Sequence, residues 1–140
     1  MEAERPLWAR LDRQPRSRAT DLRGIDVPTD PGVYAWYRVG GAVYVGKAND
    51  LRARLWGDHL GQGRSVRTSA FRRNVAERLG FGSSADIKAK RIELTTGQLA
   101  RLRAWVLACR VTWIVCGSEE EASRFEARLK TEWRPPLTKR

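Results

Sequence analysis

The sequence is poor in cysteine and histidine, and this narrows the classes of protein that it can encode. It contains two cysteines and one histidine among 140 residues. Two cysteines do not make the disulfide framework of a small secreted domain, and one histidine with two distant cysteines does not give the spacing of a zinc site. Cys109 and Cys116 both lie in apolar runs, so we expect two reduced thiols in the core.

Long apolar runs and two common enzyme motifs are also missing. No apolar run approaches the roughly 18 residues of a transmembrane helix, and the N-terminus lacks the pattern of a signal peptide. The chain has neither a Gly-x-Ser-x-Gly motif nor a Walker A loop, which argues against a serine hydrolase and a P-loop nucleotidase. We therefore expect a soluble, cytoplasmic protein without a membrane partner.

Acidic residues are scarce relative to basic ones. The chain has 27 Lys and Arg against 16 Asp and Glu, a formal net charge of +11. Residues 47–91 alone carry eleven basic and four acidic residues, a net charge of +7. A charge gathered in one third of the chain favours a surface that binds nucleic acid over a generally basic exterior. An acidic protein surface and an anionic membrane are weaker alternatives.

The length and composition favour one domain with a substantial core. A chain of 140 residues has the size of a single domain, and 41% hydrophobic residues with six tryptophans argue against wholesale disorder. Residues 1–30 hold six arginines, six acidic residues and three prolines. We expect these residues to form a basic and acidic arm that packs loosely or binds backbone phosphate, and residues 31–140 to form the domain.

Short strands and amphipathic helices follow the arm. β-branched and aromatic runs predict strands, Gly40-Gly41 predicts a hairpin turn, and capping boxes begin at Thr95 and Ser118. The predicted strands are 33–37, 42–45 and 111–116, and the predicted helices are 51–60, 69–79, 95–109 and 118–133; residues 84–94 are open between strand and turn. The order predicts an α/β fold: a small, mainly antiparallel three-stranded sheet flanked by helices, with a helical insertion at about 61–110.

One carboxylate lies where packing would not place it. At about 100° per residue, Glu126 falls within the apolar stripe of the last helix. An unpaired carboxylate there is costly, so a cation, a metal ion or a local cleft should compensate it; a structural pair with an arginine is the alternative. Lys47 at a strand end and Arg54 on the next helix can converge with Glu126. A carboxylate, Arg, Lys and nearby tyrosines suit phosphodiester cleavage.

These residues belong to an ordered series of motifs. The series is Gly32-Val33-Tyr34, then Tyr44-Val45-Gly46-Lys47, then a helix over 48–55, then Glu126-Ala127-Arg128-Leu129 before a proline pair. It resembles the paired signature, the arginine helix and the glutamate helix of the GIY-YIG nuclease family, over residues 31–138. The resemblance implies a GIY-YIG-like fold and a Mg²⁺-dependent endonuclease.

The resemblance also implies a role for each matched residue. Glu126 would hold one Mg²⁺ or Mn²⁺ ion, and Arg54 would contact the scissile phosphate. Tyr34 and Tyr44 would flank the nucleophile, and one of them would relay its proton; our interpretation favours Tyr34 narrowly. Lys47 would steady the phosphate or lower the pKa of a tyrosine.

Two positions depart from the family pattern. The family often has His or Tyr four residues after the arginine, but here His59 lies five residues after Arg54, about 140° away on a regular helix. A local bulge at Gly57 would restore His59 to the site; otherwise that role is vacant. Thr138 stands where the family often has Asn, and it can make one hydrogen bond there but not an amide's set.

The predicted hairpin provides a structural test of a shared tyrosine site. If Gly40 and Gly41 form a regular two-residue turn, Tyr34 and Tyr44 face opposite sides of the sheet. Both tyrosines reach one site only if the loop has an odd length or a strand contains a bulge. We predict that one of these irregularities is present.

Basic and aromatic residues extend the site towards a substrate. We expect Trp36, Trp113 and Trp133 in the core, and Trp8 and Trp56 exposed for base stacking. Gly46 would let the backbone approach substrate. A DNA track following the arginine helix is favoured over a solvated helix face. The residues predicted to bind substrate are Gly46, Arg52, Arg64, Arg67, Arg72, Arg73, Lys88, Lys90 and Arg91.

The sequence therefore predicts a divalent-metal-dependent endonuclease that hydrolyses DNA. One alternative is a nucleic-acid-binding module whose catalysis has decayed or needs a partner, and another is a nuclease that acts on RNA. The oligomeric state is open; cutting of both strands would favour a homodimer.

Overall fold

The computed structural model describes residues 4–60 and 66–139, and an antiparallel sheet lies at its centre. The strands are β1 (Ser17–Arg18), β2 (Gly32–Arg38), β3 (Gly41–Ala48) and β4 (Arg110–Val115), in the spatial order β1-β4-β2-β3. The predicted α/β fold is confirmed, but the sheet has four strands rather than three. The additional strand β1 pairs two residues with β4 and is too short to leave a periodic signal in the sequence.

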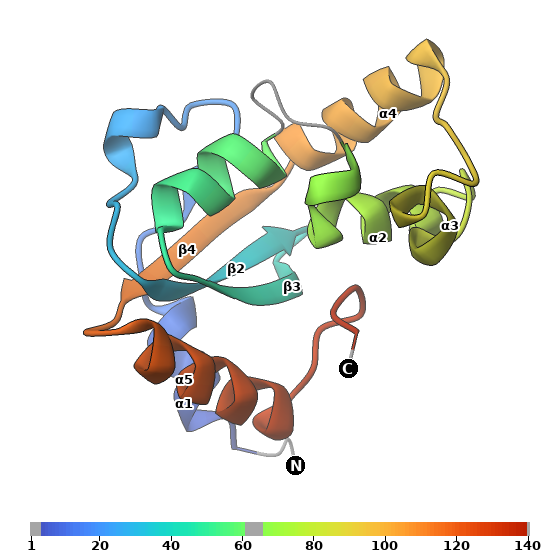
Figure 1. The fold of residues 1–140 in the computed structure, drawn as a ribbon. Helices are drawn as coiled ribbons and strands as arrows, with labels where there is room; N and C mark the ends of the chain where they lie inside the picture. The colour runs from blue at the N-terminus through green and yellow to red at the C-terminus, as the bar shows by residue number, and fades with distance from the viewer. Residues whose placement is uncertain (1–3, 61–65, 140) are drawn as a thin grey trace.

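Helices cover both faces of the sheet (Figure 1). Helices α1 and α5 lie against one face, and the helix over 51–59 lies with α2, α3 and α4 against the other. Their bounds are α1 (Pro6–Asp12), η1 (Gly24–Asp26), η2 (Ala53–His59), η3 (Val66–Thr68), α2 (Ala70–Arg78), α3 (Ser84–Lys88), α4 (Thr96–Leu107) and α5 (Glu119–Glu132). Within the described ranges, none of the helices is both long and apolar enough to cross a membrane.

The alternation of side chains along β2 fills two cores. Val33 and Ala35 are buried in the core beneath α1 and α5, whereas Tyr34 and Trp36 are buried in the core beneath α2 and α4. Trp36 stacks on a phenylalanine of α2 at 5.0 Å between ring centroids. Because successive residues of a strand point to opposite faces, the same alternation decides which side chains of the hairpin can share a site.

The N-terminal segment is part of the fold rather than a loosely packed arm. Trp8 and Leu11 are fully buried against α5. The indole Nε1 of Trp8 donates to the carbonyl oxygens of Leu129 and Trp133 at 3.0 and 2.8 Å. The predictions of loose packing and of an exposed Trp8 are therefore wrong, whereas binding of backbone phosphate by this segment stays a prediction. The apolar stripe of α5 needs a cover, and α1 supplies it.

The other tryptophans lie closer to their predicted positions. Trp36 is fully buried, and Trp113 and Trp133 are half-buried and packed against the two cores. Trp56 is half-buried rather than exposed, and its ring covers Gly24. Both cysteines are free and buried, as predicted.

The helix starts follow the capping signals in the sequence. Thr95 forms the predicted box with Gln98, since each side chain accepts a hydrogen bond from the backbone N–H of the other. Ser118 caps α5 through the N–H of Glu121, but the Glu121 carboxylate accepts from Gly117, so only half of that box forms. The ambiguous residues 84–94 contain helix α3 and a loop.

The hairpin contains the predicted irregularity. Its turn has two residues, Val39 and Gly40, one position earlier than expected. The pairing shifts between Trp36 and Tyr37, which leaves Val43 as an extra residue in β3. This bulge pairs Tyr34 with Gly46 and Trp36 with Tyr44, so Tyr34 and Tyr44 lie on the same face of the sheet.

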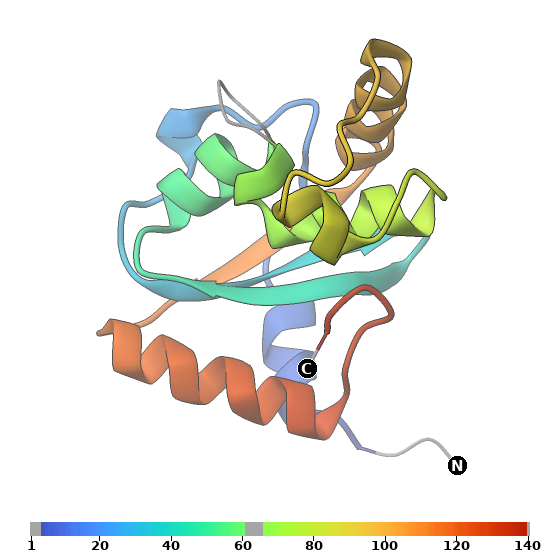
Figure 2. The ribbon, with the colours of Figure 1, turned by 45° about the vertical axis from the view of Figure 1, so that its right-hand side comes forward.

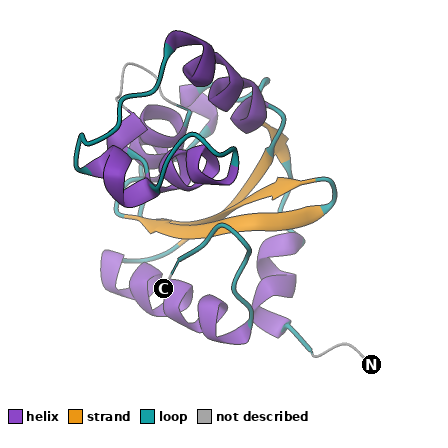
Figure 3. Cartoon of the chain, turned by 90° about the vertical axis from the view of Figure 1, so that its right-hand side faces the viewer, coloured by secondary structure: helices purple, strands orange, loops and turns teal. Residues whose placement is uncertain are grey.

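The C-terminal loop lies beside β3 at this bulge (Figure 3). The N–H of Leu137 donates to the carbonyl of Val43 at 2.9 Å, and the Thr138 hydroxyl accepts from the N–H of Val45 at 2.9 Å. Thr138 thus makes a hydrogen bond of the kind expected for it. The loop satisfies backbone groups on the edge strand next to the two tyrosines.

Val39 should be a source of backbone strain in the turn. Its φ of 51° lies in the left-handed region, which is unfavourable for a β-branched residue, and its side chain is fully exposed. Asn followed by Gly is the preferred pair for a turn with two positive φ angles. We expect Val39→Asn to raise the free energy of unfolding by roughly 1 kcal/mol, measured by urea denaturation.

Ile25 provides a matched control for this substitution. It is also an exposed aliphatic residue, at 76% exposure, but it has no positive φ. Ile25→Asn should therefore leave the free energy of unfolding nearly unchanged. An equal gain from both variants would mean that the lost surface hydrophobicity, and not the turn, is responsible.

Candidate active site

The two tyrosines of the hairpin form the floor of the candidate site. The rings of Tyr34 and Tyr44 are stacked with centroids 6.4 Å apart, and Tyr34 is 2% exposed. A Cβ atom on Gly46 would lie 2.6 Å from Cζ of Tyr34. Gly46 is therefore needed to make room for the Tyr34 ring across the strand pair. This is a different reason for glycine from the predicted approach of substrate to the backbone.

The helix after the hairpin contains the bulge that the misplaced histidine requires. After Leu51 and Arg52 it continues as the π-helix η2, in which the N–H of Leu60 donates to the carbonyl of Leu55 at 3.0 Å. The wider turn brings His59 towards the sheet. Its Nε2 is hydrogen-bonded to the Tyr34 hydroxyl at 2.6 Å. Of the two alternatives left open by the sequence, the structure has the one in which His59 joins the tyrosines.

His59 connects Tyr34 to a serine that the sequence did not single out. The Nδ1 of His59 is hydrogen-bonded to Ser69 Oγ at 2.6 Å, and Ser69 Oγ also accepts from the backbone N–H of Arg72. Ser69 was recognisable only as the start of the second predicted helix, because its contact with His59 depends on how two helices pack. The three side chains form one buried hydrogen-bonded chain from Tyr34 to Ser69.

His59 is neutral in this environment. Burial, followed by the nearby charges of Arg54, Arg72 and Arg73, holds the pKa of His59 well below its ordinary value of 6.5. A neutral imidazole has one donor and one acceptor nitrogen. His59 therefore accepts at one end of the chain and donates at the other, and it holds the Tyr34 hydroxyl in a fixed position.

The buried imidazole should make stability depend on pH. In the unfolded chain His59 takes up a proton as the pH falls below 6.5, whereas the folded protein excludes it. The unfolded state then binds more protons, so the free energy of unfolding falls with falling pH, by up to about 1.4 kcal/mol per unit. Because His59 is the only histidine, urea denaturation between pH 6.5 and 5 measures this effect directly.

His59→Gln is the variant that isolates the imidazole. We expect it to be less stable than wild type at pH 7, because Tyr34 and Ser69 lose a buried partner. Its stability should nevertheless vary little between pH 6.5 and 5. A wild-type protein with equal stability at both ends of this range would contradict a buried, neutral His59.

Glu126 is compensated by a lysine on its own helix. Its Oε1 lies 3.2 Å from Nζ of Lys130, one turn further along α5, and its side chain is 17% exposed. A cation is one of the predicted compensations, and it is not the arginine of the structural alternative. Lys47 reaches the same helix face, since its Nζ donates to Ser123 Oγ at 2.7 Å and Ser123 lies three residues before Glu126.

Arg54 and Glu126 both act on the tyrosines. Burial, then the Glu126 carboxylate, raises the pKa of Tyr44 to about 12, against the opposing effect of the Arg54 guanidinium. The pKa of Tyr34 is raised well above 10, mainly by burial, with the same two charges among the causes. Arg54 is 40% exposed and lies 3.8 Å from Asp58. These charges therefore converge on two protonated phenols.

The candidate site extends across edge strand β3. In Figure 2, β3 passes between α5 on one side and α2 with the helix over 51–59 on the other. Tyr34, Tyr44 and His59 lie on the α2 side of the sheet, whereas Lys47 and Glu126 belong to the α5 side. The site thus combines the hairpin, η2 and α5, which are distant in sequence.

The carboxylate of Glu126 fits a magnesium ion that takes most of its ligands from water and substrate. Among residues 4–60 and 66–139, no three or more His, Cys, Asp or Glu side chains come together as a metal site. Mg²⁺ commonly uses one or two carboxylates and keeps its remaining ligands from water and phosphate. The partly exposed carboxylate of Glu126 meets that requirement, whereas a fully protein-bound zinc or calcium ion would need more ligands.

The predicted substrate-binding residues Arg72 and Arg73 of α2 have different surroundings from Arg52, which directly precedes η2. Arg72 and Arg73 lie near the candidate site, since their charges act on His59. The Nε of Arg52 donates to the carbonyl of Val27 at 2.8 Å, and a contact of Arg52 with substrate stays a prediction. This bond ties the start of the helix to the N-terminal segment.

The remaining predicted binding residues surround α3. Arg67 donates from Nε to the carbonyl of Lys88 at 3.3 Å, and Arg91 forms a 2.7 Å ion pair with an aspartate of α3. Lys88 and Lys90 are exposed. Arg64 lies outside the described residues. Contact of this basic surface with substrate stays a prediction.

This chain matches a known family model and is similar to several solved structures. A family model described as the GIY-YIG catalytic domain matches residues 32–140. The GIY-YIG N-terminal endonuclease domain of UvrC from Thermotoga maritima, bound to its catalytic divalent cation magnesium, is 19% identical, with a TM-score of 0.44 over 96% of this chain and 98% of that one.

Two point variants of that Thermotoga maritima domain, also bound to the divalent cation, match at 20% identity. Their TM-scores are 0.46 and 0.45, and each match covers 99% of this chain and 100% of the other. Among curated protein sequences, no match is found.

Proposed function

The chain belongs to the family of GIY-YIG catalytic domains, and from this premise we propose that it is a divalent-metal-dependent endonuclease that hydrolyses DNA. The observation that carries the proposal is the convergence of charge on a buried tyrosine pair. Arg54 and Glu126 come from helices distant in sequence, and both act on the pKa of Tyr34 and of Tyr44. A carboxylate, a guanidinium and phenols that influence one another across edge strand β3 suit attack of water on a phosphodiester.

Tyr34 is the proposed acceptor of the proton from the attacking water. Its oxygen is fixed by the 2.6 Å hydrogen bond to His59, which is itself fixed by Ser69. The cationic Arg54 opposes the effect of burial on the Tyr34 pKa and so favours the tyrosinate that takes the proton. Tyr44 stacks beside it and borders the nucleophile.

Arg54 and Lys47 are the proposed cationic contacts to the phosphate. Arg54 is partly exposed and can offer two parallel N–H donors to phosphate oxygens. Lys47 is exposed and anchored to Ser123, on the helix turn before Glu126. Together they stabilise the negative charge that grows on the phosphate as the water oxygen bonds to phosphorus and the P–O bond to the leaving end of the strand breaks. The leaving oxygen takes a proton from solvent.

Glu126 is the proposed ligand of the divalent ion. When bound, the ion neutralises charge on the scissile phosphate. The ammonium of Lys130 occupies one carboxylate oxygen of Glu126, so an ion that used this oxygen would have to displace Lys130. The side chain of Lys130 is flexible and 29% exposed, so its ammonium can turn towards solvent.

A cleavage assay with a panel of substrates tests this function. The protein is incubated with supercoiled plasmid, linear duplex, branched DNA, single-stranded DNA and RNA, each with Mg²⁺ or with EDTA, and the cut sites are mapped. We expect internal cuts in DNA with Mg²⁺ and none with EDTA. Equal cleavage in EDTA would contradict the metal requirement, cleavage of RNA alone would favour the RNA nuclease, and binding without cleavage would favour a non-catalytic module.

A further inference from the structure

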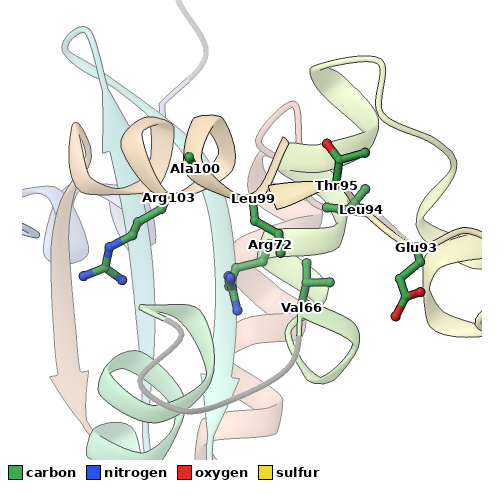
Figure 4. Close-up of a pocket in the computed structure, with 8 residues that line it drawn as sticks. All are labelled: Val66, Arg72, Glu93, Leu94, Thr95, Leu99, Ala100 and Arg103. Carbon is green, nitrogen blue, oxygen red and sulfur yellow. The ribbon is translucent and has the colours of Figure 1, made fainter. Parts of the chain in front are cut away.

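A pocket of about 690 Å³ lies between helices α2 and α4 (Figure 4). Its volume is in the range of sites that hold small ligands, about 300–1,000 Å³. The walls differ in chemistry from one end to the other. Arg72 of α2 and Arg103 of α4 line one part, leucines line the middle, and Glu93 lies at the end opposite Arg103 in Figure 4.

The cationic part of the pocket is suited to an anion. Burial, and then the charge of the nearby Arg103, lowers the pKa of Arg72, and both side chains line the pocket. An anion placed between two guanidinium groups is attracted by both, and Arg103 keeps donors for it besides the Nη1 that points to the carbonyl of Leu60 at 3.5 Å. The planar donor set of each guanidinium matches a phosphate group well.

The apolar part of the pocket is suited to a flat ring. Leu99 is 38% exposed and Leu94 is 8% exposed, and both line the pocket together with Val66. An unpaired nucleobase packs against aromatic or aliphatic side chains when it leaves its stack. These side chains offer such a surface next to the arginine pair.

The far end of the pocket is suited to the edge of a base. The Glu93 carboxylate accepts hydrogen bonds and would repel a phosphate, whereas it can accept from an exocyclic amino group. The Thr95 hydroxyl, which also lines the pocket, accepts from the backbone N–H of Gln98 and keeps one O–H donor. The order of cation, apolar wall and acceptor along the pocket therefore matches the order of phosphate, base ring and base edge in one nucleotide.

The pocket also adjoins the candidate active site. Arg72 lines it, and the backbone N–H of Arg72 donates to Ser69 Oγ, which is hydrogen-bonded to His59. The charge of Arg72 contributes to the lowered pKa of His59. Helix α2 thus contributes to both the pocket and the candidate active site.

We propose that the pocket receives one unpaired nucleotide of the substrate, with its phosphate between Arg72 and Arg103 and its base against Leu94 and Leu99. This inference rests on the proposed nuclease function and narrows its substrate. The preferred DNA would contain a flap, a gap or an extruded base beside the cut, rather than uninterrupted duplex. Arg103, which the sequence did not single out, becomes a residue that determines specificity.

Binding in EDTA tests the proposal without cleavage. The full-length protein is titrated with a fluorescent blunt duplex and with the same duplex carrying a short single-stranded flap, and the ratio of the two affinities is measured. We expect wild type to prefer the flap by about 10-fold or more, as base contacts of this type contribute. Arg103→Gln and Leu99→Asn, two changes at exposed positions, should each remove most of that preference.

Arg128→Gln is the matched control, since it removes the same charge from an exposed position of α5, on the opposite side of the sheet. It should leave the affinity ratio unchanged. A ratio that Arg103→Gln and Leu99→Asn do not change would overturn the proposal. So would an equal loss of affinity for both DNAs in Arg103→Gln, since that result indicates a general phosphate contact.

Two further measurements separate the possible explanations. The first is binding of free AMP, which carries a phosphate and a base. If AMP binding depends on Arg103 but the flap preference does not, the pocket is a small-molecule site and the proposal is wrong. Cleavage by wild type with Mg²⁺ is assayed in parallel. No cleavage, with an Arg103-dependent flap preference, would refute the nuclease and keep the pocket, whereas cleavage without that dependence would refute the pocket alone.

Discussion

Glu126→Gln is expected to lower the rate of Mg²⁺-dependent DNA cleavage by at least about 10³-fold. The change keeps the shape of the side chain but removes the charge that would hold the divalent ion. Neutralisation of phosphate charge by a bound metal contributes several kcal/mol to the transition state, and about 4 kcal/mol corresponds to this factor. The rate is measured in single-turnover experiments at saturating protein, so that weaker DNA binding does not enter.

The fold should tolerate this substitution. Glu126 loses a partly exposed ion pair with Lys130, an interaction that contributes less than about 1 kcal/mol. Circular dichroism and DNA affinity in EDTA are expected to stay close to wild type. Glu120→Gln, an exposed position in the first turn of the same helix, provides the control and should cleave normally. Cleavage by Glu126→Gln at the wild-type rate would remove Glu126 from the mechanism.

The parts of the fold that the sequence predicted are those with a local signal. Capping residues, hairpin signals and helical periodicity located β2 to β4, α2, α4 and α5 within a few residues. The alternation of side chains along a strand also predicted an irregular hairpin, because Tyr34 and Tyr44 lie on one face only if the loop has an odd length or a strand contains a bulge. Strand β1 has two residues and helix α3 has five, and segments this short have no period to detect.

The contacts of the candidate site depend on tertiary packing and were harder to predict. Periodicity placed Glu126 on the buried side of its helix but did not identify Lys130 as its partner. The positions of Ser69 and Ser123 follow from how neighbouring elements meet, which no single segment encodes. Trp8 was expected at the surface, because its cover comes from α5, more than a hundred residues later in the chain.

Tyr34→Phe is the second substitution with a large expected effect. It removes the oxygen that would accept the proton of the attacking water, and loss of general base catalysis lowers rates by about 10² to 10⁴-fold. In wild type, the pKa of Tyr34 lies well above 10, so tyrosinate is a minor species at neutral pH. Its population, and with it the single-turnover rate, should rise nearly tenfold per unit between pH 7 and pH 9.

The dependence on pH distinguishes a base from a structural phenol. Tyr34→Phe should retain a low rate that no longer rises in this way, while His59 stays neutral over the same range and adds no step of its own. Tyr37→Phe is the matched control, since Tyr37 lies on the same strand, faces the other core and donates to Asp12 at 2.7 Å. That variant should lose stability but keep the pH profile. If Tyr34→Phe kept the wild-type slope, the proton would have to leave by another group, and Tyr34 would serve only to position His59 and Tyr44.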